Sequence, residues 1–119
     1  MIDSKSRLAL ITATIMALVM IVVFWIFSSG WSLRLTFVPG VILAYILFLL
    51  TIKRKTPEPQ HLLPLYLIAV AVQMLHFAEE YLTGFYINFP EIFGGASYSP
   101  EVFVAFNMSA YFAFVTGAV

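Results

Sequence analysis

A run of 20 residues without a charged side chain, residues 8–27, constrains this chain more than any other feature. Its side chains are almost all apolar, and about 20 such residues are what a helix needs to cross the hydrocarbon core of a bilayer. Lys5 and Arg7 precede the run, as basic residues precede a signal peptide. The apolar part of a signal peptide is shorter, however, at about 7–15 residues. We therefore predict a retained membrane helix.

The composition extends this prediction to the whole chain. Of the 119 residues, 62% are hydrophobic and only 10% are charged, whereas about 25% charged residues is usual in a soluble domain. The net charge is zero, which provides no basic surface for nucleic acid, so membrane lipids are the expected partners. The chain has no cysteine, which excludes disulfides and thiolate chemistry.

The apolar segments predict an all-α helical transmembrane bundle that forms a single domain over residues 1–119. We expect about four membrane-spanning helices, over residues 8–27, 35–52, 62–83 and 102–119.

Prolines mark where some of these helices should bend or begin. Pro39 lies inside the second span, where it could kink the helix. Pro64 is expected in the first turn of the third span, where a missing N–H costs little. Ser99 and Pro100 precede the fourth span as an N-cap residue followed by a proline at the first helical position.

The basic residues predict the orientation of the chain in a cell membrane. Lys5 and Arg7 precede the first span, and three more basic residues, at 53–55, follow the second, whereas Arg34 stands alone between them. Since basic residues concentrate on cytoplasmic loops, we predict a multi-pass protein with a cytoplasmic N-terminus. Residues 84–100, which have no Lys or Arg, should then lie on the opposite side as an interfacial or re-entrant segment.

Ionisable side chains near the end of the third span are the candidate functional site. Gln73, His76, Glu79, Glu80 and Thr83 recur at helical spacing, so they share one side of a helix. His76 reaches Glu79 three residues on and Glu80 four residues on. Charged groups inside a membrane usually face a cavity or the bundle interior, and they often carry function.

Two interpretations of these residues remain open. In the first, His76 and Glu80 are ligands of a divalent metal, and Glu79 is the acid–base group of a catalytic site. In the second, the three residues form a proton relay or a polar joint between helices, with Arg34 or Asn107 as the partner. His61, at the start of the third span, is too far along the helix to join this site and is interpreted as an interfacial or capping residue.

The motif His76-Phe-Ala-Glu79-Glu80 and the residues after it resemble the HXXEE-domain family of multi-spanning membrane proteins. The similarity covers residues 64–119 and includes Gly-Phe-Tyr at 84–86, Phe-Pro at 89–90 and the downstream Asn107. It implies a membrane-embedded enzyme, metal-dependent under the first interpretation, in which His76, Glu79 and Glu80 act on an apolar or lipidic substrate.

The resemblance also implies that family members continue beyond the end of this chain. Later segments of the family, rich in Gly, His and Pro, are not found here, so we expect a truncated copy of the family pattern. The alternative to a membrane-embedded enzyme is a non-catalytic carrier or interaction protein. An oligomer could supply further polar groups from another copy of the chain.

Overall fold

The computed structural model describes residues 4–52 and 58–117, and their regular elements are five α-helices. This confirms the predicted all-α class. The chain divides into two compact units. The first comprises Met1–Thr56 with Phe93–Gly95, and the second comprises Pro57–Ile92 with Ala96–Val119. The prediction of a single domain stays a prediction.

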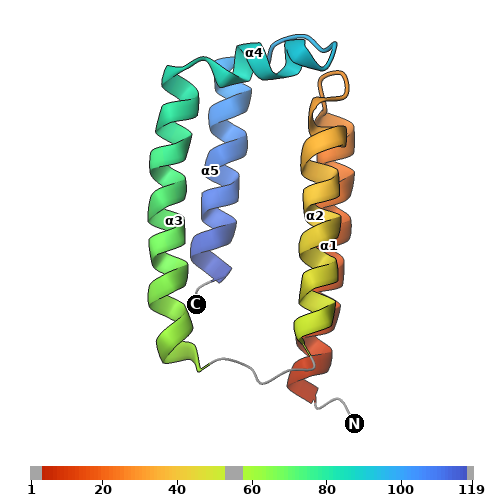
Figure 1. Ribbon diagram of the computed structural model, residues 1–119, viewed down its shortest axis with the longest axis vertical. Helices are drawn as coiled ribbons and strands as arrows, with labels where there is room; N and C mark the ends of the chain where they lie inside the picture. Colours follow the sequence, from red (N-terminus) through yellow and green to blue (C-terminus); the bar gives the residue numbers. More distant parts are fainter. Residues whose placement is uncertain (1–3, 53–57, 118–119) are drawn as a thin grey trace. The chain divides into compact units, whose positions relative to one another are not determined.

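The first unit is a helical hairpin of α1 (Ser4–Phe27) and α2 (Ser32–Thr51), which lie side by side (Figure 1). Phe24 of α1 packs its ring 5.1 Å from that of Phe37 in α2. Further along the pair, the hydroxyls of Thr14 and Tyr45 lie 2.7 Å apart. Because Thr14 already donates its proton to the Leu10 carbonyl, Tyr45 must be the donor between the two helices.

The turn between α1 and α2 is closed by Ser28. Its hydroxyl accepts from the backbone N–H groups of Leu33 (3.1 Å) and Arg34 (3.4 Å), which are in the first turn of α2. These N–H groups have no partner inside the helix, so Ser28 acts as a cap from four residues upstream of Ser32.

Two glycines allow the Phe93–Gly95 segment to dock on this turn. Gly30 has a φ of +59°, and a Cβ built on it would lie 2.6 Å from the backbone nitrogen of Gly95. A Cβ on Gly95 would lie 2.4 Å from the carbonyl of Ser29. The close approach lets the Trp31 N–H donate to the Phe93 carbonyl at 3.2 Å. Only glycine fits at both positions.

The second unit consists of α3 (Pro59–Leu82), the short α4 (Phe85–Ile92) and α5 (Pro100–Gly117). Figure 1 shows α3 and α5 running antiparallel, with α4 crossing at the end where α3 finishes. Aromatic rings fill the space between them. Phe77 of α3 packs against both Phe103 (5.5 Å between centroids) and Tyr111 (5.9 Å) of α5, and Tyr86 of α4 packs on Phe103 (5.2 Å).

Three of the described helices, α1, α2 and α3, are long and apolar enough to cross a membrane. They match the predicted spans 8–27, 35–52 and 62–83 to within a few residues. Large apolar side chains remain exposed along them; Leu75 of α3, for example, is 73% exposed. The region predicted as a fourth span, 102–119, forms α5 as far as Gly117, and its membrane crossing stays a prediction.

Two predictions about where prolines begin a helix can be compared with the structure, and one of them needs correction. Ser99 accepts from the Val102 N–H at 3.2 Å and Pro100 is the first residue of α5, which confirms the predicted cap. The prediction for Pro64 was wrong, because α3 begins at Pro59 and Pro64 is its sixth residue. Pro59 takes the first helical position after Glu58, whose extended backbone is the one favoured before a proline.

Candidate functional site

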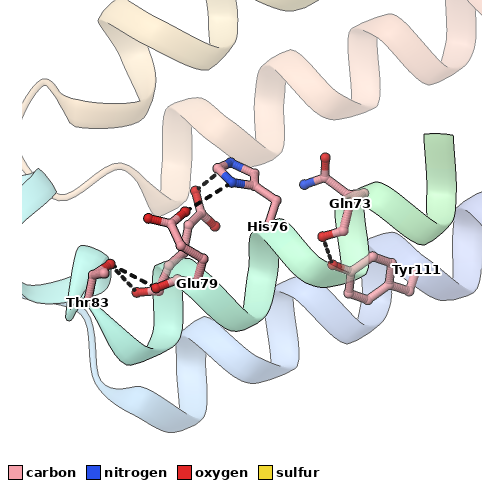
Figure 2. A network of polar contacts seen from close by, with 6 residues as sticks. Gln73, His76, Glu79, Thr83 and Tyr111 are labelled. Carbon is pink, nitrogen blue, oxygen red and sulfur yellow. Dashed lines mark hydrogen bonds and ion pairs between the residues drawn. The ribbon is translucent and has the colours of Figure 1, made fainter.

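The predicted ionisable residues lie in the last two turns of α3 (Figure 2). At 1.5 Å per residue, His76 is about 9 Å from the end of the helix at Leu82, and Glu80 is about 3 Å from it. The α3 side chains that are less exposed recur every three or four residues, at Tyr66, Val70, Gln73, Phe77 and Glu80. Phe77 shows that this side of the helix packs on α5. His76 and Glu79 lie beside that packed face and are more exposed.

His76 contacts both glutamates, one with each ring nitrogen. Its Nδ1 lies 3.3 Å from an oxygen of Glu79, and its Nε2 lies 3.2 Å from an oxygen of Glu80. The two carboxylates differ in environment, because the Glu79 side chain is 63% exposed and that of Glu80 is 14% exposed. The imidazole therefore bridges an exposed carboxylate and a largely covered one. We call these three residues the His–Glu–Glu triad.

The contacts determine how many protons the triad needs. A neutral imidazole has one N–H donor and one bare nitrogen, and an ionised carboxylate only accepts. Both contacts can be hydrogen bonds only if the triad holds two protons, either both on the ring or one on the ring and one on a carboxyl group. With two protons its net charge is −1, and with one it is −2. The state with a net charge of −1 costs less free energy in a membrane than the state with −2.

The predicted metal ligands, His76 and Glu80, are in contact, and metal binding by them stays a prediction. The two nitrogens of an imidazole point away from each other, so the two carboxylates lie at opposite edges of the ring and do not converge with one nitrogen on a common point. A catalytic zinc takes three protein ligands around one position. Within residues 4–52 and 58–117, no group of three or more His, Cys, Asp or Glu side chains is placed to hold a metal ion.

Gln73 and Thr83 are the first and last of the polar residues predicted to share one side of a helix, and each takes part in a hydrogen bond that a backbone carbonyl of α3 accepts. The Thr83 hydroxyl donates to the carbonyl of Glu79 at 2.9 Å, and so satisfies a backbone group in the last turn of α3. The backbone carbonyl of Gln73 accepts a hydrogen bond of 2.6 Å from the hydroxyl of Tyr111 (Figure 2).

The predicted partners of the glutamates are engaged within their own units. Asn107 donates its amide to the Phe103 carbonyl of its own helix at 2.9 Å, and no hydrogen bond from it to a glutamate is present in the described part of the chain. Arg34 donates to the carbonyl of Trp25 at 3.2 Å, inside the first unit. Its pairing with Glu79 or Glu80 stays a prediction, because those carboxylates belong to the second unit.

His61 lies apart from the triad, as expected. Its Nδ1 is 3.6 Å from an oxygen of Glu58 at the start of α3, and its side chain is 81% exposed. This pair repeats the His–Glu contact of the triad in a largely exposed position. It therefore provides a matched control for experiments on His76.

Tyrosines form hydrogen bonds between α3 and α5, where the sequence predicted a polar joint of Asn107 and the charged residues. Besides Tyr111, Tyr66 of α3 donates to the Phe114 carbonyl of α5 at 2.5 Å. The sequence does indicate that these tyrosines form hydrogen bonds, since a tyrosine inside an apolar helix needs a partner for its hydroxyl. It does not indicate which residue is the acceptor, because the acceptor is a backbone carbonyl that any residue could supply.

These features define the class of protein: an all-α chain with three candidate spans, as expected of a multi-pass membrane protein. Comparison with known proteins adds no further assignment, since no family model, no curated protein and no solved structure matches the chain. The resemblance to the HXXEE-domain family thus rests on the motif residues alone.

Proposed function

We propose that this chain is a multi-pass membrane protein whose His–Glu–Glu triad passes protons between an exposed and a covered carboxylate. One observation carries the proposal: the two nitrogens of His76 contact different carboxylates, 63% exposed at Glu79 and 14% exposed at Glu80. An imidazole can accept a proton at one nitrogen and release one from the other, which is why histidine serves in proton relays.

The transfer can be written with each proton accounted for. A proton leaves the Glu79 carboxyl group and binds Nδ1 of His76, and the proton on Nε2 moves to the Glu80 carboxylate. The ring begins and ends neutral, in opposite tautomers, and Glu80 ends protonated. Since a neutral carboxyl group is cheaper to keep in a covered site than a carboxylate, the covered member is suited to hold the proton.

The test is proton movement across vesicles containing the full chain. A pH-sensitive dye inside the vesicles reports the decay of an imposed pH step, with protein-free vesicles as the baseline. We expect His76→Gln to return the decay rate to that baseline. His61→Gln, which removes the matched exposed histidine, should leave it at the wild-type value. A His76→Gln protein that conducts protons like the wild type contradicts the relay.

A membrane-embedded enzyme of the HXXEE type is the second candidate. It is favoured by the accessibility of the triad, because the side chains of His76 and Glu79 are 52% and 63% exposed and could reach a substrate beside α3. In this function Glu79 or Glu80 would be the acid–base group, His76 would orient it, and the substrate would be apolar or lipidic. Mass spectrometry of lipids incubated with wild-type and Glu79→Gln protein tests it. A product formed only by the wild type would favour the enzyme over the relay.

A further inference from the structure

Trp25, Trp31 and Arg34 form a second polar cluster, at the end of the α1–α2 hairpin; we call it the Trp–Arg cluster. The guanidinium carbon of Arg34 lies 5.0 Å from the ring centroid of Trp25 and 5.6 Å from that of Trp31. Both distances are within the range of a cation–π interaction. Its Nε also donates to the Trp25 carbonyl at 3.2 Å. Three contacts therefore hold the guanidinium in place.

The hydrogen bond to Trp25 has a structural role of its own. Trp25 is two residues before the end of α1, so no N–H group inside the helix donates to its carbonyl. The partial negative charge at the C-terminal end of a helix also favours a cation there. This role uses one of the five N–H donors of the arginine. Among the described residues, nothing accepts from its Nη groups or from the two indole N–H groups. Trp25 and Trp31 are 49% and 53% exposed, and Arg34 is partly exposed, so the cluster as a whole is open to its surroundings.

The positive charge of Arg34 is not balanced within its own unit. The sequence of that unit contains one acidic residue, Asp3, which precedes the start of α1. Trp25 is near the opposite end of α1, and Arg34 is in the first turn of α2. The helices on either side are apolar. A cation at such a position is stabilised by an anion that reaches it from outside the unit.

The depth of the cluster indicates which anion is available. α1 ends at Phe27 and α2 begins at Ser32, so the cluster lies where both candidate spans end. Tryptophan is enriched at this level of a membrane, beside the lipid headgroups. The phosphate of a headgroup is an anion with several acceptor oxygens, and the planar fork of arginine matches its geometry with two parallel hydrogen bonds.

We propose that the Trp–Arg cluster binds the phosphate of an anionic lipid headgroup. The Nη groups of Arg34 donate to the phosphate oxygens, while the indoles of Trp25 and Trp31 flank the guanidinium and offer their N–H groups to the same headgroup. None of these three residues belongs to the His–Glu–Glu triad, so the lipid site and the relay are tested by different variants.

The experiment uses tryptophan fluorescence, because Trp25 and Trp31 are the two tryptophans of the chain. The full chain in maltoside micelles, which contain no phosphate, is titrated with phosphatidylglycerol. We expect a saturable change in emission. Arg34→Gln should weaken the apparent affinity by about fivefold, the factor expected for losing one basic residue at a membrane surface. Arg7→Gln, which removes an arginine from the other end of α1, should leave it unchanged.

Arg34→Lys provides a second measurement if Arg34→Gln does not fold. It keeps the charge and loses the fork, so its affinity should fall between those of the wild type and Arg34→Gln. Two further titrations distinguish the sources of the ligand. Inorganic phosphate that binds as tightly as the lipid overturns the lipid assignment in favour of a free anion. Diacylglycerol that gives the same response overturns the phosphate chemistry altogether.

Two results would overturn the proposal from the protein side. One is that both Arg34 variants titrate like the wild type, which would leave Arg34 only its contact with the end of α1. The other is that the response to phosphatidylglycerol appears only after Glu79 and Glu80 are both changed to Gln. The native counter-ion of Arg34 would then be one of those carboxylates.

Discussion

The hydroxyl of Tyr111 in α5 donates to the backbone carbonyl of Gln73 in α3 at 2.6 Å, three residues before His76. Tyr66 makes the reciprocal contact, from α3 to the Phe114 carbonyl of α5 at 2.5 Å. Because the two helices are antiparallel, two such bonds at different heights fix how far one helix slides along the other. The tyrosines therefore set the position of the His–Glu–Glu triad against α5.

Removing the Tyr111 hydroxyl should weaken the pairing of α3 and α5. We expect Tyr111→Phe to lower the free energy of unfolding by about 0.6 kcal/mol, the average for a hydrogen bond between membrane helices. Titration of the protein with a denaturing detergent measures it. Tyr81→Phe is the control, since Tyr81 stacks on Tyr86 at 5.8 Å and its hydroxyl has no hydrogen bond within the described residues. Equal losses in both variants would contradict the assignment.

The two contacts of His76 should be visible by nitrogen NMR. The chain has two histidines, so a sample labelled with ¹⁵N-histidine gives two imidazole spin systems, and His61→Gln identifies the one from His76. We expect neither nitrogen of His76 to show the shift of a free, unbonded nitrogen. Glu79→Gln should mainly affect the Nδ1 signal and Glu80→Gln the Nε2 signal, because each nitrogen lies beside a different glutamate.

A different NMR result would remove the basis of the relay. If His76 is a single neutral tautomer with one bare nitrogen, one of its two carboxylate contacts is not a hydrogen bond. If the two glutamate variants change the same nitrogen, the ring does not bridge them.

Much of the fold could be predicted because the membrane restricts helices to long apolar segments. The sequence predicted α1, α2 and α3 to within a few residues, and the cap at Ser99. The start of α3 was misplaced because two prolines, Pro59 and Pro64, both suit a first turn and the sequence does not say which is used.

The candidate site was predicted only as far as one helix extends. The spacing of His76, Glu79 and Glu80 along α3 determines that they meet, so their contacts followed from helical geometry. Which carboxylate is covered depends on packing beyond α3, and the packing of α3 on α5 rests on aromatic rings and tyrosine hydroxyls. The sequence does not show this packing. Asn107 was expected to form a hydrogen bond with a glutamate, whereas it donates to the Phe103 carbonyl of its own helix.

The hydrogen bond between Thr14 and Tyr45 should stabilise the α1–α2 hairpin. A double-mutant cycle of Thr14→Val and Tyr45→Phe measures their coupling in the free energy of unfolding. We expect about 0.6 kcal/mol, as between other membrane helices. Thr51→Val is the control, because the Thr51 hydroxyl donates to carbonyls of its own helix, at Leu47 and Phe48. Its effect should simply add to that of Tyr45→Phe; a coupling as large as that of Thr14 would contradict a specific pair.

The docking of Phe93–Gly95 on the α1–α2 turn should fail when Gly95 gains a side chain. In Gly95→Ala the new Cβ would lie 2.4 Å from the carbonyl of Ser29, so the segment must move away. Overpacking of this kind costs about 1–3 kcal/mol. The Trp31 N–H would then lose its acceptor, the Phe93 carbonyl, and its hydrogen exchange should accelerate by roughly tenfold or more.

Gly40→Ala is the matched control for this measurement. Gly40 lies inside α2, and a Cβ there meets no atom within 4 Å, so Trp31 should exchange at the wild-type rate. Alanine also favours the helix over glycine, which should leave α2 at least as stable. If Gly95→Ala leaves the exchange of Trp31 unchanged, the segment does not dock there. Acceleration in both variants would mean instead that the amide responds to the stability of α2 as a whole, and that the tight fit of Gly30 and Gly95 is not what protects it.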